Sequence, residues 1–176
     1  MNRGCYTGVG SRRAPPEMVN FATSLATVLS TWGLRVRSGG ADGMDTGFER
    51  GDPWAEVFVP WNGYNGRWMP QNQVGVPLRA YDIAKSTHPA WNALSSGARK
   101  LHARNVQQVL GFDLNNPSKF LICWTPDGCE TEAERTRETG GTATAIIVAA
   151  RHSIPVFNLA KPGSYDRLVD FLPSLL

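Results

Sequence analysis

Apolar residues recur every three or four positions between residues 17 and 32, which is the spacing of one face of an amphipathic helix. Pro16 suits the first turn of that helix, and Gly33 suits its end. Short runs at 3–9 and 34–37 flank it; each is too short for a stable helix and is suited to a strand. A second helix at 42–50 and a third strand at 55–59 follow. The pattern therefore predicts a strand–helix–strand–helix–strand order.

This order is typical of a parallel sheet with right-handed crossovers. Two further strands are predicted at 120–124 and 154–159, and the remaining predicted helices lie at 79–85, 89–110, 142–152 and 164–172. We expect an α/β fold of the three-layer Rossmann-like kind, with a mostly parallel sheet of about five strands flanked by helices. The 176 residues suit one domain, 1–176, because two separate cores would each be small.

The segment at about 60–78 interrupts the pattern. It is rich in Gly, Asn and aromatic residues, and it is predicted to be an irregular insertion or a lid. Trp61, Tyr64 and Trp68 are candidates for stacking on a bound base. Such aromatic residues can equally cover the edge of a small core or form an oligomer interface, and this interpretation is favoured for Trp54 and Trp91.

Composition narrows the class of protein. Apolar residues make up 41% of the chain and charged residues 19%, as in a globular protein. No run approaches the roughly 18 apolar residues of a membrane span, and no signal peptide follows Arg3, so a cytoplasmic protein without a membrane partner is expected. The three cysteines and three histidines have no ligand spacing, so no disulfide framework, metal site or cofactor is expected.

The net charge of +3 is only mildly basic. A dedicated nucleic-acid-binding protein usually carries a concentrated basic patch. The nearest candidate here is a short cluster on a predicted helix, formed by Arg99, Lys100, His102 and Arg104. The cluster permits binding of an anion without establishing a nucleic-acid site.

Three glycine-rich turns, at 8–11, 38–43 and 139–142, each precede a predicted helix. The carboxyl ends of parallel strands meet at one edge of the sheet, where ligands of such folds bind. Helix N-termini present unpaired N–H groups and partial positive charge there. The three turns together predict a pocket for a phosphorylated nucleotide or a nucleotide-derived ligand.

The first two turns carry polar side chains as well. Ser11 and Arg12 suit a phosphate or a ribose, although this turn alone is as consistent with a plain strand-to-helix connection. In the second turn, Asp42 suits the N-cap of the next helix. Asp45 and Glu49 are spaced to share a helical face with it. They are either solvated acids or groups that bind a ribose hydroxyl or act as a general acid or base, and both are candidate catalytic residues.

The third turn places hydroxyls beside paired glycines, at Gly140, Gly141, Thr142 and Thr144. Small residues at this position allow a helix to pack closely on the sheet. Hydroxyls at a helix N-terminus also suit a phosphate, and this interpretation is favoured.

Four runs of the sequence resemble a known family: GSR at 10–12, SGGADGMD at 38–45, ARN at 103–105 and GGTATAIIVAARHSIPVFNL at 140–159. They are similar to the Rossmann domain of the DNA-processing protein A family and, more broadly, to the SLOG superfamily, which includes the Lonely Guy phosphoribohydrolases. The resemblance implies that Arg104 and Asn105 join the pocket. The complete expected ligand site is Gly8, Gly10, Ser11, Arg12, Gly39, Gly40, Ala41, Asp42, Asp45, Arg104, Asn105, Gly140, Gly141, Thr142 and Thr144.

The chain departs from these relatives in two ways. Ala145 stands where the Lonely Guy enzymes carry a catalytic glutamate, so enzymatic activity is left open and would need Asp45 or Glu49 as a substitute. DNA-processing proteins bind single-stranded DNA and usually have additional domains, for which 176 residues leave no room.

Three functions stay open. The first is binding of a phosphorylated nucleotide or an NAD- or ADP-ribose-derived molecule, to sense or sequester an immune signal, as in a stand-alone phage protein in its host's cytoplasm. The second is an N-glycosidase, phosphoribohydrolase or deoxyribosyltransferase-like enzyme. The third is single-stranded DNA binding. The likeness also implies a homodimer or higher homo-oligomer as one option.

Overall fold

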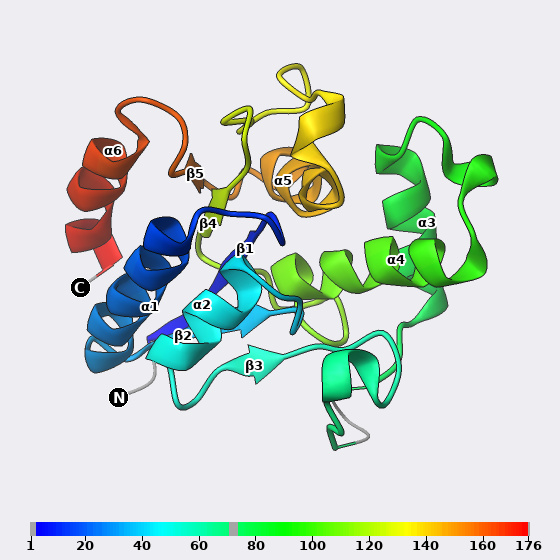
Figure 1. The fold of residues 1–176 in the computed structure, drawn as a ribbon, viewed down its shortest axis with the longest axis horizontal. Helices are drawn as coiled ribbons and strands as arrows, with labels where there is room; N and C mark the ends of the chain where they lie inside the picture. Colours follow the sequence, from blue (N-terminus) through cyan, green and yellow to red (C-terminus); the bar gives the residue numbers. More distant parts are fainter. Residues whose placement is uncertain (1–2, 71–73, 176) are drawn as a thin grey trace.

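The computed structural model describes residues 3–70 and 74–175. Five strands form one sheet in the order β3-β2-β1-β4-β5, and every neighbouring pair is parallel (Figure 1). The α/β, Rossmann-like architecture expected from the sequence is therefore confirmed. The strands are β1 Gly4–Gly10, β2 Leu34–Ser38, β3 Glu56–Val57, β4 Leu121–Trp124 and β5 Val156–Asn158.

Helices cover both faces of the sheet. One apolar core joins α1, α2 and α6 to one face, and another joins α3, α4 and α5 to the other. The alternation of strand residues produces this division: Ile122 of β4 faces the first core, while Leu121 and Cys123 face the second. The helices are α1 Pro16–Thr31, α2 Met44–Gly51, α3 Leu78–Thr87, α4 Ser96–Leu110, α5 Thr142–Arg151 and α6 Ser164–Phe171.

Two predicted helix starts were wrong. The helix expected at residue 42 begins at Met44, because Gly43 has a φ of 80° and a ψ of −124°, which no helical residue adopts. The side chain of Asp42 consequently makes no capping bond, and it accepts a hydrogen bond from Asn65 instead. The helix expected over 89–110 is interrupted after a short 3₁₀ turn, and α4 begins at Ser96, where Ser95 caps it.

The aromatic segment at about 60–78 includes residues 71–73, which lie outside the described residues. Its first part contacts the turn between β2 and α2. The amide of Asn65 donates to the carbonyl of Gly40, 2.9 Å away, and Arg67 forms an ion pair of 2.5 Å with Glu49. No helix in the described ranges is both long and apolar enough to cross a membrane.

Candidate functional site

A cavity of about 590 Å³ lies at the carboxyl ends of the strands. Loops that follow β1, β2 and β4 line it, together with α4 and the first turn of α5. The strand order reverses direction between β1 and β4, and ligands of open parallel sheets bind at such a position. Ten of the expected ligand residues line the cavity: Gly10, Ser11, Arg12, Ala41, Asp45, Arg104, Asn105, Gly140, Gly141 and Thr142.

The other five expected ligand residues do not line it; these are Gly8, Gly39, Gly40, Asp42 and Thr144. Gly8 allows Val36 and Phe48 to pack closely against β1, because a Cβ there would lie 2.6 Å from Val36 and 2.7 Å from Phe48. Thr144 is buried and contacts Nδ1 of His102 at 2.8 Å.

Glu49 is not brought to the cavity either. It accepts a hydrogen bond from Ser38 at 2.5 Å and pairs with Arg67. Of the two candidate catalytic acids, only Asp45 lies where a bound ligand could meet it.

Asp45 and Arg104 both form hydrogen bonds with the backbone of the turn after β2. Asp45 Oδ2 accepts from the backbone N–H of Gly39 at 2.9 Å and from Gln108 at 3.3 Å. The guanidinium of Arg104 donates to the carbonyls of Gly39 and Phe58. Gly39 allows this approach, since a Cβ there would lie 2.3 Å from the guanidinium. Most of the hydrogen-bonding capacity of Arg104 is thus used within the protein.

Burial dominates the electrostatics of this pair. Desolvation raises the pKa of Asp45 from 3.8 to about 6, against the opposing influence of nearby Arg104 and the hydrogen bond from Gly39. Desolvation likewise lowers the pKa of Arg104, which Asp45 partly counters. Asp45 Oδ1 has no hydrogen-bond partner among the residues that the structure describes. Asp45 therefore offers the cavity one carboxylate oxygen whose protonation changes near neutral pH.

The opposite side of the cavity is formed by the start of α5. Gly141 is the N-cap and Thr142 the first helical residue. Within the described ranges, neither of their backbone N–H groups has an acceptor, and the side chains of Arg13 and Arg137 have no polar partner. We call these four residues the candidate anion site. Two guanidiniums and a helix N-terminus are the groups that proteins use to bind phosphate.

None of the three aromatic candidates lines the cavity. Tyr64 is buried; its hydroxyl accepts from Arg12 at 3.0 Å, and its ring lies 5.4 Å from the Arg104 guanidinium. Contrary to expectation, Tyr64 thus orients arginines and presents no open ring face. Trp61 and Trp68 are exposed, with Lys100 5.9 Å from the ring of Trp61. Stacking of a base on Trp61 or Trp68 stays a prediction.

Sequence reasoning missed several cavity residues. Arg13 follows Ser11 and Arg12 but was not among the expected ligand residues, and Arg137 and Glu138 lie in a loop without periodicity. His102 also lines the cavity; desolvation, with the nearby charges of His88 and Arg135, lowers the pKa of His102 to about 4. The signal that could have identified Arg13 and Arg137 was their position beside glycine turns.

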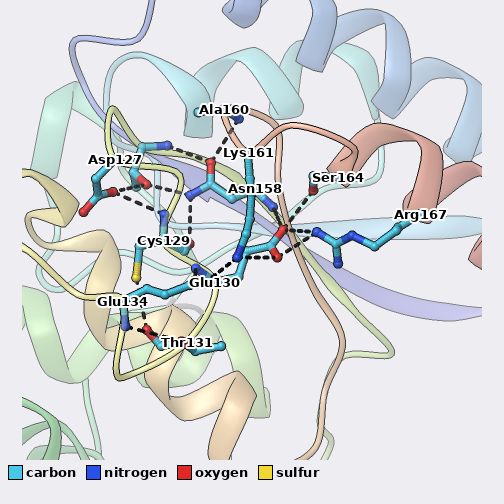
Figure 2. A network of polar contacts seen from close by, with 11 residues as sticks. Asp127, Cys129, Glu130, Thr131, Glu134, Asn158, Ala160, Lys161, Ser164 and Arg167 are labelled. Atoms are coloured by element: carbon cyan, nitrogen blue, oxygen red, sulfur yellow. Dashed lines mark hydrogen bonds and ion pairs between the residues drawn. The ribbon is translucent and has the colours of Figure 1, made fainter.

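The loop between β4 and α5 forms one wall of the cavity, and a dense polar network fixes it (Figure 2). Glu130 is buried and accepts from the backbone N–H of Asn158 and the hydroxyl of Ser164, both at 2.9 Å, and from Arg167 at 2.6 Å. We call the set around it the loop network: Asp127, Glu130, Glu134, Asn158, Lys161, Ser164 and Arg167.

Asp127 joins the network to the cavity wall. Its carboxylate accepts from the hydroxyls of Thr125 at 2.7 Å, Thr136 at 2.6 Å and Thr139. Burial alone would raise the pKa of Asp127, but the three hydroxyl hydrogen bonds outweigh it and lower the pKa to about 2. Since Thr136 and Thr139 flank Arg137, Asp127 holds the stretch that carries this arginine and leads into the start of α5.

No protein-family model matches the chain. No curated protein matches it either. Among solved structures, DNA processing protein A from Helicobacter pylori, described for its single-stranded DNA binding mode, is similar with a TM-score of 0.38 and 16% identity, over 95% of this chain and 80% of that one.

Proposed function

We propose that the cavity binds a phosphorylated nucleotide or an ADP-ribose-type molecule, with a phosphate at the candidate anion site. The observation that carries this proposal is that two guanidiniums without a polar partner among the described residues, those of Arg13 and Arg137, line the same cavity as the N-terminus of α5. Four arginines and two acids line the cavity, so an anionic ligand is favoured electrostatically. The volume of about 590 Å³ falls in the range of small-molecule sites.

The remaining lining suits the rest of a nucleotide. Asp45 Oδ1 can accept a hydrogen bond from a ribose hydroxyl. Val9, Ala98 and Leu101 supply an apolar surface for the base. Trp61 is linked to the cavity through its edge-to-face contact with Tyr64, whose hydroxyl accepts a hydrogen bond from Arg12.

Binding without cleavage is the favoured activity, because Ala145 lines the cavity and provides no acid there. A protein of this kind would sense or sequester a nucleotide signal. A second candidate is cleavage or transfer at an N-glycosidic bond, with Asp45 as the acid or base. Its buried carboxyl, with a pKa of about 6, is suited to proton transfer near neutral pH.

Calorimetric titration with AMP, ADP-ribose and cyclic ADP-ribose isomers, followed by chromatography of each mixture, separates these functions. Saturable binding with intact ligand recovered supports the binding protein. Release of free base that is lost in Asp45→Asn supports the enzyme. Salt-sensitive binding of single-stranded oligonucleotides without binding of any mononucleotide would contradict both and favour a DNA-binding protein.

A further inference from the structure

Adjacent residues of α4 connect two turns that lie on different sides of the cavity. Arg104 donates to the carbonyl of Gly39 in the turn after β2, and to that of Phe58 at 3.2 Å. Arg104 Nε donates to Asn105 Oδ1 at 3.2 Å, and Asn105 Nδ2 donates to the carbonyl of Gly141 at 2.9 Å. A continuous chain of hydrogen bonds therefore runs from the second glycine turn to the start of α5.

The last bond of this chain acts on a single peptide unit. The carbonyl of Gly141 and the N–H of Thr142 belong to the same planar peptide group, in which they point in opposite directions. The carbonyl of Gly141 also accepts from the backbone N–H of Thr144 at 3.4 Å, so the Asn105 amide at 2.9 Å is the shorter of its two donors. A donor that fixes the carbonyl also fixes the direction of the Thr142 N–H. It polarises the same peptide as well, which strengthens that N–H as a donor to an anion.

The two ends of the Asn105 amide have different partners. Arg104 can only donate, so it requires the oxygen of the amide on its side and directs the amide nitrogen to Gly141. The resemblance implied that both residues contact a ligand. Although Asn105 lines the cavity, its oxygen and nitrogen are each bonded within the protein.

We propose that Asn105 is a positioning residue: it orients the peptide between Gly141 and Thr142 so that the Thr142 N–H meets the phosphate, and Arg104 anchors it. The effect on a ligand rests on the proposed function. The orientation of the peptide does not, and it can be measured without any ligand.

The affinity test uses AMP as the probe and the variants Asn105→Ala and Asn105→Asp. Ala removes the donor without adding charge, so affinity falls by about tenfold or more at every pH, as expected for a lost hydrogen bond to a bonded carbonyl. Asp adds a charge and, when ionised, cannot donate to Gly141. The affinity of Asn105→Asp for AMP, relative to that of the wild type, recovers as the pH falls toward about 4, the ordinary pKa of an aspartate. The protonated carboxyl can then donate a hydrogen bond to Gly141. Exposed Asn20→Asp on α1 carries the same charge and leaves affinity unchanged.

The ligand-free test follows backbone amide resonances of the same proteins. In Asn105→Ala, the Thr142 amide resonance shifts and its hydrogen exchange changes, while the amides of α1 and α6 stay in place, as does the midpoint of urea unfolding within error. An unmoved Thr142 resonance overturns the proposal, as does wild-type affinity in Asn105→Ala. If AMP fails to bind the wild type, the proposed function is wrong, and the Thr142 resonance alone then decides whether Asn105 positions the peptide.

Discussion

The loop network and the candidate anion site lie at the same edge of the sheet, and both combine charged side chains with the start of a helix. In the network, Glu130 contacts Ser164, the first residue of α6, and Arg167 one turn later. At the anion site, Arg13 and Arg137 line the cavity together with the start of α5, and neither side chain has a polar partner in the part of the chain that the structure describes. The protein supplies its own anion at α6 and supplies none at α5.

This difference distinguishes charges that stabilise the fold from charges that are available to a ligand. Charges that are paired and buried contribute to the fold, and removing one partner leaves the other uncompensated. Exposed, unpaired charges contribute little to the fold, so their arrangement around one helix start is better explained by a ligand. Two acids at this edge of the sheet differ in another way: the pKa of Asp127 is lowered to about 2 by its hydroxyl partners, and the pKa of Asp45 is raised to about 6 by burial.

The largest expected effect is on stability, in Glu130→Gln. Glu130 is 8% exposed; its carboxylate accepts hydrogen bonds from Asn158, Ser164 and Arg167 and also pairs with Lys161 at 3.5 Å. Its loss of charge should lower the free energy of unfolding by about 3 kcal/mol or more, at the low end for a buried ion pair because Arg167 is half exposed. The matched control is Glu134→Gln, which removes an exposed ion pair with Lys161 and should cost below about 1 kcal/mol. Equal costs in urea unfolding would contradict the distinction between the two glutamates.

The second effect is a pH dependence from Asp45. Because the pKa in the folded state is raised from 3.8 to about 6, the folded protein holds this proton more tightly than the unfolded chain does. The stabilisation is complete below about pH 4 and is lost as the pH rises through about 6, by up to about 3 kcal/mol. Asp45→Asn should remove this fall. Unfolding curves of wild type and variant that stay parallel from pH 4 to 7 would show that Asp45 is not perturbed.

Asp127 should give the opposite sign. Its pKa is lowered to about 2, so the stabilisation it provides is present above its ordinary value and is lost as the pH falls toward 2. Asp127→Asn therefore flattens the acid side of the stability profile, while Asp45→Asn flattens the region from about 4 to 6. Unfolding curves measured across both ranges distinguish the two carboxylates.

The third effect is on binding and leaves the fold unchanged. Arg13→Gln and Arg137→Gln should each weaken AMP binding by about tenfold or more, since a charge-assisted hydrogen bond contributes about 1.5–3 kcal/mol. Stability should stay within about 0.5 kcal/mol. Exposed Arg79→Gln on α3 removes the same charge away from the cavity and should change neither quantity. A loss of stability without a loss of affinity would place both arginines in a structural role.

Much of the fold could be predicted because its signals are local. The alternation of apolar and charged residues at 34–37 and the periodicity of 17–32 depend on neighbours in sequence, and the structure has a strand and a helix there. The start of α2 was misplaced because the positive φ of Gly43 is a property of the folded turn. Asp42 suits a cap in sequence, but only residues at the true helix boundary can cap.

The sequence predicted where the site lies but not the role of each residue in it. Glycine turns indicated where the cavity lies, yet Tyr64 is buried beneath Arg104, which depends on tertiary packing. Arg137 lies beside the glycine turn at 139–142 but in a loop without periodicity, because contacts between residues distant in sequence hold that loop. The hydrogen bond that Arg167 donates to Glu130 joins residues 37 positions apart, and no local pattern encodes it.

The proposed phosphorylated ligand binds at the start of α5, and a substitution of Gly141 tests this binding directly. Its φ of −63° and ψ of −24° suit any residue, and a Cβ there meets no atom within 4 Å; Gly97 on α4 has the same open space but does not line the cavity. In amide-resonance titrations with ADP-ribose, the account predicts saturable shifts at residues 10–13 and 140–142 that Gly141→Leu abolishes and Gly97→Leu retains. Undiminished binding in a folded Gly141→Leu variant, or shifts confined to residues outside the cavity, would contradict it.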